Sequence, residues 1–160
     1  MVFRPRPTAL LVLALLLAAS APASRAAQTQ PLVKWRSIAA GEAEAKKSGK
    51  PVLYYFTAAW CGPCHQLENE VFSKKDVADR IAKDFVPIVV RDEYRETGRN
   101  APEMLALADR YGLRGFPTLV VSRPGLGRGV TMEGWNGSES AVQFLKTARG
   151  RLEAAEKKKA

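Results

Sequence analysis

Residues 59–65, Ala-Trp-Cys-Gly-Pro-Cys-His, hold both cysteines and the one histidine of the chain. Two thiols separated by two residues and followed by a histidine can attach a c-type haem, because the thiols bond its vinyl groups and the imidazole binds its iron. The same two thiols, placed after a tryptophan at the start of a helix, can instead make and break a disulfide bond. The spacing leaves both chemistries open.

A purely structural disulfide is a weaker interpretation of this pair. Only Gly62 and Pro63 separate the cysteines, so a bond between them closes a loop too small to restrict the unfolded chain appreciably. We therefore interpret Cys61 and Cys64 as a pair that switches between an oxidised and a reduced state.

The N-terminal residues have the features of a secretory signal. Arg4 and Arg6 occur without any acidic residue, and residues 9–19 are an uninterrupted run of Leu, Val and Ala. Small residues follow and suit cleavage after Ala23, so we predict a signal peptide over residues 1–23. The apolar run is shorter than the ~20 residues that span a bilayer. An uncleaved N-terminal anchor is the alternative, and either way we expect a periplasmic or secreted protein.

The remaining chain has room for one domain. We expect a flexible segment over residues 24–36, a folded domain over residues 37–150 and a basic tail over residues 151–160. With 25 basic and 16 acidic residues, the formal charge is +9. A basic chain can favour acidic surfaces, although the lysines of the tail are also typical of a solvated helix end. Basic and aromatic residues do not alternate as in nucleic-acid modules, so we expect no nucleic-acid partner.

The order of apolar and polar residues predicts an α/β fold. The first expected strand is apolar throughout, as in a central strand covered on both faces. Because helices join the first three strands, we expect these strands to be parallel neighbours, with the last two forming a hairpin. The cysteines then follow the carboxyl end of the first strand, where open α/β sheets place their chemistry. The expected elements are a helix over 37–47, strand 52–57, helical spacing over 61–85, strand 85–90, loop 91–99, a helix over 101–111 capped by Asn100, strands 118–121 and 130–133, and a last helix from Ser138.

Two motifs together resemble the thioredoxin family. Trp60-Cys61-Gly62-Pro63-Cys64 follows the buried strand, and Tyr-Gly-Leu-Arg-Gly-Phe-Pro-Thr lies about fifty residues on, at 111–118. With the order of the elements, the resemblance covers roughly residues 50–145. It implies a thioredoxin-like fold, with a central mixed sheet of about four strands flanked by helices. It also implies a thiol-disulfide oxidoreductase that needs no cofactor or metal ion.

The cysteines then take different roles. Cys61 begins a helix, where free N–H groups and the positive end of the helix dipole stabilise an anion, so its thiol is expected to ionise readily and attack. Cys64, one turn further in, is expected to be more buried and to resolve the mixed disulfide. Gly62 lets a substrate chain approach, and Pro63 fixes the first turn without losing a needed N–H.

Three further residues are expected to support the site. Trp60 is expected to form an apolar lid beside the sulfurs, with ordinary packing as the alternative. By resemblance, Pro117 is a cis proline that faces the disulfide, and the backbone of Phe116 pairs with the substrate strand. His65, which directly follows Cys64, is expected to lie on an exposed helix face.

One position departs from the family pattern. Thioredoxins usually carry a buried Asp six residues before the first cysteine, and this chain has Tyr55 there. A neutral phenol cannot accept the proton of the inner thiol near pH 7, so water or another group must. Asp92 and Glu93 are candidates, with solvated loop acids as the simpler interpretation.

Three functions remain possible at this point. A haem protein would need a second axial ligand, for which the sequence offers only Met104 and Met132. A thioredoxin-like module for copper delivery could use the soft thiolates but lacks further donors. We favour a reductase, since the Gly-Pro pair goes with reducing members of the family. Its substrates would be exported proteins with disulfides and its electron donor a membrane thiol reductant, and we expect a monomer.

Overall fold

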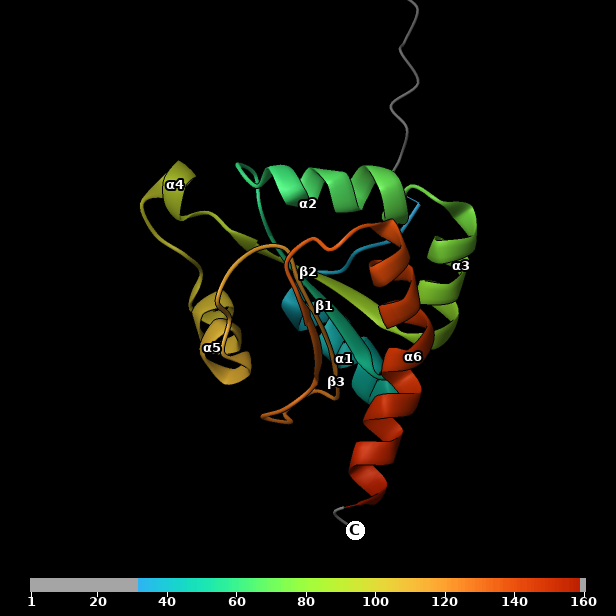
Figure 1. The fold of residues 1–160 in the computed structure, drawn as a ribbon. Helices are drawn as coiled ribbons and strands as arrows, with labels where there is room; N and C mark the ends of the chain where they lie inside the picture. The colour runs from blue at the N-terminus through green and yellow to red at the C-terminus, as the bar shows by residue number, and fades with distance from the viewer. Residues whose placement is uncertain (1–31, 159–160) are drawn as a thin grey trace, which may run out of the picture.

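A computed structural model describes residues 32–158 (Figure 1). The predicted signal peptide lies outside the described residues. The elements follow one another as α1 (Ile38–Ser48), β1 (Val52–Ala58), α2 (Gly62–Leu67), the π-helix η1 (Glu68–Phe72), α3 (Lys75–Asp84), β2 (Val86–Asp92), α4 (Tyr94–Thr97), α5 (Pro102–Tyr111), β3 (Thr118–Ser122), β4 (Val130–Glu133) and α6 (Ser138–Lys157). Every expected strand is present, and α4 lies in the segment expected to be a loop.

The four strands form one mixed sheet in the order β2-β1-β3-β4. β1 pairs in parallel with β2, but antiparallel with β3, so the expectation of three parallel strands was wrong. Thr118 at the start of β3 pairs with Phe56 near the end of β1. Residues 112–117, after α5, therefore return the chain to the end of the sheet where β1 finishes. A helical connection permits parallel pairing without enforcing it.

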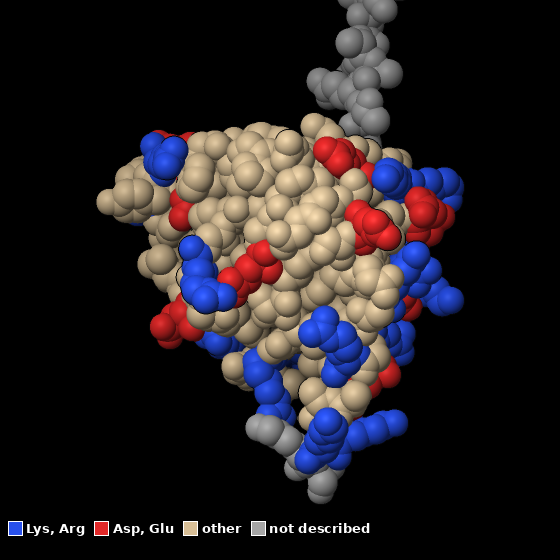
Figure 2. Space-filling model, viewed as in Figure 1, with Lys and Arg blue, Asp and Glu red and all other residues tan. Residues whose placement is uncertain are grey.

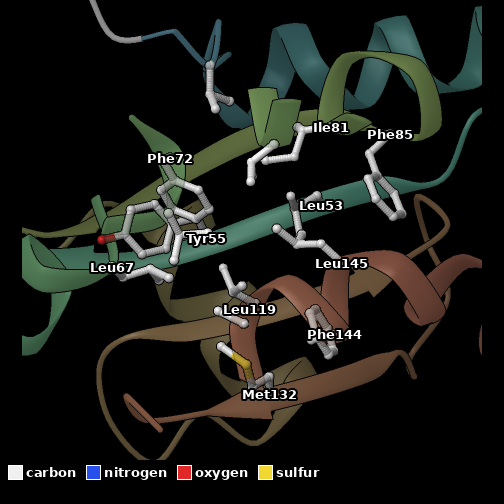
Figure 3. Close-up of a cluster of buried hydrophobic side chains, with 14 of the residues drawn as sticks. Leu53, Tyr55, Leu67, Phe72, Ile81, Phe85, Leu119, Met132, Phe144 and Leu145 are labelled. Carbon is white, nitrogen blue, oxygen red and sulfur yellow. The ribbon is translucent and has the colours of Figure 1, made fainter. Parts of the chain in front are cut away.

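β1 is the centre of the fold because both of its faces are covered. All seven of its residues are buried, as the continuous apolar run predicted. Leu53 and Tyr55 face a core built with α2, η1, α3 and α6 (Figure 3). Tyr54 and Phe56 face a second core built with α1 and α5. Full burial of each such side chain contributes about 1.5–3 kcal/mol, so this strand holds the start of α2 on a rigid base.

Residues 33–36, which we expected to belong to a flexible segment, pack against the sheet. Val33 is buried, and Arg36 forms a parallel bridge with Ile88 on β2. The Arg36 N–H donates to the Pro87 carbonyl at 3.0 Å, and the Val89 N–H donates to the Arg36 carbonyl at 3.1 Å. These bonds satisfy backbone groups on an edge strand, which explains why the segment is ordered.

The last helix includes most of the segment expected to be a basic tail. α6 continues to Lys157, with Leu152 buried in the first core. Basic side chains gather at this lower end of the molecule, whereas the face over α2 is largely uncharged (Figure 2). Within residues 32–158, no helix combines the length and the hydropathy that a membrane span requires.

Candidate active site

The two cysteines meet where β1 ends and α2 begins. The chain turns after Ala58, whose carbonyl accepts the Cys61 N–H at 3.1 Å. Cys61 is the N-cap of α2, and its Sγ accepts the backbone N–H of Cys64 at 3.2 Å. The pair forms a disulfide with an S–S distance of 2.10 Å. The structure thus describes the oxidised form of the dithiol.

Both cysteines are buried in this oxidised form, Cys64 completely and Cys61 with 3% of its surface exposed. What distinguishes them is their position, since Cys61 is the N-cap of α2 and Cys64 lies inside the helix. Gly62 and Pro63, between them, are both exposed in the first turn of α2. A Cβ atom on Gly62 would meet no atom within 4 Å, so the backbone at this point faces open space. A partner chain can therefore approach the disulfide from the side of Gly62.

The second motif lies beside the first, although about fifty residues separate them in the sequence. The Phe116-Pro117 peptide bond is cis, as the resemblance implied. The ring centroids of Trp60 and Phe116 lie 5.8 Å apart, with an angle of 81° between the ring planes. Trp60 is 42% exposed, so it covers one side of the site and still presents its indole to a partner.

His65 lies on the exposed side of α2, as expected, but it is not free of contacts. Its Nε2 lies 2.9 Å from the Ala59 carbonyl, so Nε2 carries the proton and donates. Its Nδ1 lies 3.5 Å from Oε2 of Glu68. The imidazole therefore links the turn before the cysteines to the carboxylate that follows them.

Tyr55 and Glu68 occupy the space behind the disulfide. The Tyr55 hydroxyl lies 3.1 Å from Oε1 of Glu68 and 3.3 Å from the carbonyl oxygen of Cys64, with Glu68 the nearer acceptor. Burial raises the pKa of Tyr55 well above its ordinary value, and the nearby Glu68 carboxylate raises it further. Tyr55 therefore stays protonated and acts as a donor, while the acceptor in this pair is Glu68.

Glu68 was missed in the sequence because it belongs to the polar face of a helix. Its position one turn after Cys64 was the available signal, but nothing in the pattern linked it to Tyr55 on the strand. The two acids considered in the sequence lie where β2 ends: Asp92 is in register with Ala58 and accepts the side-chain N–H of Asn100 at 2.9 Å, and Glu93 begins α4. Asn100 is therefore part of this loop and does not cap α5, whose N-cap is Ala101.

A cavity connects the Tyr55–Glu68 pair with the surface. It has a volume of about 460 Å³, and its walls include Trp35, Phe72 and Arg91 as well as the pair itself. Its polar groups and its size suit water molecules. Within residues 32–158, no three His, Cys, Asp or Glu side chains gather into a metal-binding group.

Comparison with known proteins agrees with this geometry. The family described as "Thioredoxin-like domain" matches residues 39–149. The chain belongs to this thioredoxin-like family. A thioredoxin from Thermus thermophilus has the same fold, with a TM-score of 0.58 and 25% identity over 72% of this chain and 85% of that one.

Two curated relatives extend the comparison. Thioredoxin M4 from Arabidopsis thaliana is 33% identical over 49% of this chain and 35% of its own length. Thiol:disulfide interchange protein DsbD 1 from Pseudomonas aeruginosa is 32% identical over 65% of this chain, but the match spans only 17% of that protein. The thioredoxin-like fold and the Cys61–Cys64 pair are those of a thiol-disulfide oxidoreductase.

Proposed function

We propose that this protein reduces disulfides in exported proteins by dithiol exchange through Cys61 and Cys64. The observation that supports this most directly is the N-cap position of Cys61, whose sulfur accepts a backbone N–H at 3.2 Å. In the reduced protein, that donor favours the thiolate over the thiol, and a thiolate is the form that attacks disulfides.

The exchange takes two steps. The Cys61 thiolate attacks one sulfur of the substrate disulfide, forming a mixed disulfide and releasing the other substrate sulfur as a thiolate. The Cys64 thiol then loses its proton and attacks the Cys61 sulfur, which closes the Cys61–Cys64 disulfide and releases the second substrate thiolate. Two electrons pass from the dithiol to the substrate, and the released thiolates take up protons from water.

Glu68 is the group that we propose as acceptor of the Cys64 proton. Its Oε1 already accepts the Tyr55 hydroxyl, which reaches the Cys64 carbonyl from the same side. The adjoining cavity can hold the water that carries the proton onward. A half-exposed carboxylate on the helix thus takes the role usually given to a buried Asp at position 55.

Trp60, Phe116 and Pro117 form the surface on which the substrate chain would lie. Trp60 is exposed and packs edge-on against Phe116, so it offers an apolar contact beside the attacking sulfur. The backbone of Phe116, next to the cis proline, is the expected partner of an extended substrate strand. Gly62 leaves the approach open on the other side.

The cellular setting of the proposal comes mainly from the N-terminal sequence. A secretory leader over residues 1–23 would place the domain in the periplasm or outside the cell. The oxidised pair must then receive two electrons from a dithiol donor, and a membrane thiol reductant is the class that we propose. The chain is similar to 17% of DsbD 1, a thiol:disulfide interchange protein, and this similarity supports the proposal that a thiol-disulfide exchange partner supplies the electrons.

A trapping experiment tests this function. In Cys64→Ser the mixed disulfide cannot resolve, so exported proteins should be captured through Cys61 in the native compartment. The matched control, Cys61→Ser, keeps the inner cysteine, Cys64, and should capture none. Equal capture by the two variants would contradict the role of Cys61. If no partner is captured while copper co-purifies with a protein unable to reduce bis(2-hydroxyethyl) disulfide, the copper-delivery alternative is favoured.

A further inference from the structure

Arg95 lies on the exposed indole of Trp60. The Arg95 Cζ is 3.8 Å from the centroid of the Trp60 ring. Figure 1 shows the short helix α4, which carries Arg95, standing beside the start of α2, where the disulfide lies. A guanidinium stacked on a ring uses its flat face, so the N–H groups in its plane stay available for another partner.

The loop that carries Arg95 is fixed by its own hydrogen bonds. The Asn100 Oδ1 accepts the Glu93 N–H at 2.7 Å, and the Asn100 Nδ2 donates to Asp92 at 2.9 Å. The Thr97 hydroxyl lies 2.7 Å from the Arg99 carbonyl and 2.9 Å from the Glu93 carbonyl. Because the loop is already ordered, Arg95 is preorganised, and binding a partner there requires little further ordering.

Arg95 is the charged group in contact with the aromatic surface of the site. Within residues 32–158 it forms no ion pair with a carboxylate; its recorded contact is the indole. Glu93 and Glu96 are exposed on the same loop and reduce its net charge. The neighbouring Tyr94 is 63% exposed and extends the apolar surface around the cation.

We propose that Arg95 selects partner polypeptides with an Asp or Glu next to the cysteine that Cys61 attacks. This proposal rests on the proposed function and names the class of substrate. A strand that pairs with the Phe116 backbone runs close to Trp60, since the two rings are in contact. A carboxylate on that strand can then accept two parallel N–H bonds from the guanidinium, a geometry that lysine cannot provide.

Matched peptide substrates test the selection. The substrates are disulfide-linked peptide dimers that differ only in the residue after cysteine, which is Glu, Gln or Lys. Each peptide carries a fluorophore that is self-quenched in the dimer, so reduction raises the fluorescence. The reduced protein is mixed in excess, and single-turnover rates are measured at low and high salt. Wild type should reduce the Glu dimer about 1.5-fold to fivefold faster than the Lys dimer at low salt, the range of an exposed ion pair. High salt should shrink this ratio.

Variants on the same loop separate Arg95 from the general charge of the surface. Arg95→Gln should abolish the preference for the Glu dimer, and Arg95→Glu should reverse it. Arg99→Gln removes an equal charge from the loop and should keep the wild-type ratio. The proposal is overturned if wild type treats the three dimers alike, if Arg95→Gln slows all three equally, or if Arg99→Gln has the same effect. Reduction of bis(2-hydroxyethyl) disulfide by wild type reports separately on the proposed function.

Discussion

Glu68→Gln removes a negative charge behind the disulfide and keeps the shape of the side chain. The Gln Oε1 can still accept the hydrogen bond that Tyr55 donates to Glu68 at 3.1 Å. What the variant loses is a base for the Cys64 proton. We therefore expect the attack of Cys64 on the mixed disulfide to slow near pH 7, and the earlier attack by Cys61 to change less.

The size of this effect follows from the position of Glu68. A positioned general base contributes about 10² to 10⁴ in rate. The Glu68 side chain is 38% exposed and touches Cys64 through the Tyr55 hydroxyl, so water can replace part of its action and the lower bound applies. Removing the negative charge also favours the Cys64 thiolate, by at most about 1 kcal/mol or fivefold at this exposure. The net expectation is a slowing of about twentyfold.

Stopped-flow absorbance with dithiobis(nitrobenzoate) separates the two steps. The first nitrothiophenolate is released by Cys61 and the second by Cys64, whose rate does not depend on reagent concentration because the step is intramolecular. A general base helps only while the attacking thiol still carries its proton. At alkaline pH, where a thiolate forms without a base, the variant should approach wild type.

Glu70→Gln is the matched control for this experiment. Glu70 lies two residues further along the helix, and its Oε2 accepts the Ser138 hydroxyl at 2.8 Å. Loss of the Glu70 carboxylate should leave the second phase, the release of nitrothiophenolate by Cys64, unchanged. If Glu68→Gln and Glu70→Gln both follow the wild-type second phase across neutral pH, Glu68 does not accept the proton.

The remaining predictions concern stability. Burial raises the pKa values of Tyr54 and Tyr55 above those of the unfolded chain, so the stability they contribute is complete below about pH 10 and falls as the pH rises further. Urea unfolding and phenolate absorbance at increasing pH should show these two tyrosines ionising only with unfolding; ionisation of all four tyrosines in the folded protein near pH 10 would contradict this. Gly41→Ala should destabilise the protein by about 1–3 kcal/mol in urea unfolding, because its Cβ would lie 2.3 Å from Cγ1 of Ile88. Gly150→Ala, in a helix with no atom near the new Cβ, should stabilise it by about 0.5–1 kcal/mol, and equal losses would refute the steric argument.

The parts of the site that depend on neighbouring residues could be predicted from the sequence. Cys61 and Cys64 span one turn after a buried strand, so the N-cap position of Cys61 and the burial of Cys64 inside the helix follow from helix geometry. The cis bond before Pro117 has no such local cause, and it could be predicted only because two separated motifs together resemble a family. The contact between the Phe116 and Trp60 rings was not predicted.

The parts that depend on long-range packing could not be predicted. The direction of β3 is set by the path of residues 112–117, which no periodicity describes. The conformation of the segment that holds α4 depends on hydrogen bonds from the Asn100 side chain to Asp92 and to the Glu93 N–H. The composition of this stretch indicates only a loop. Glu68 has the spacing of an ordinary solvated helix residue.

Tyr55 and Glu68 form one hydrogen-bonded arrangement behind the disulfide. The Tyr55 ring fills the core beside Trp35 and Phe72, whose ring centroids lie 5.3 Å and 5.1 Å from its own. These packing contacts compensate for the burial of the Tyr55 side chain. A carboxylate at the same position would lie close to Glu68, and two like charges at such a distance cannot both stay ionised easily. Because the core holds the neutral phenol of Tyr55, the negative charge belongs instead to Glu68, on the helical segment after the cysteines, where water can reach it. The nucleophile, the resolving thiol and the proposed base then lie within the continuous segment of α2 and η1.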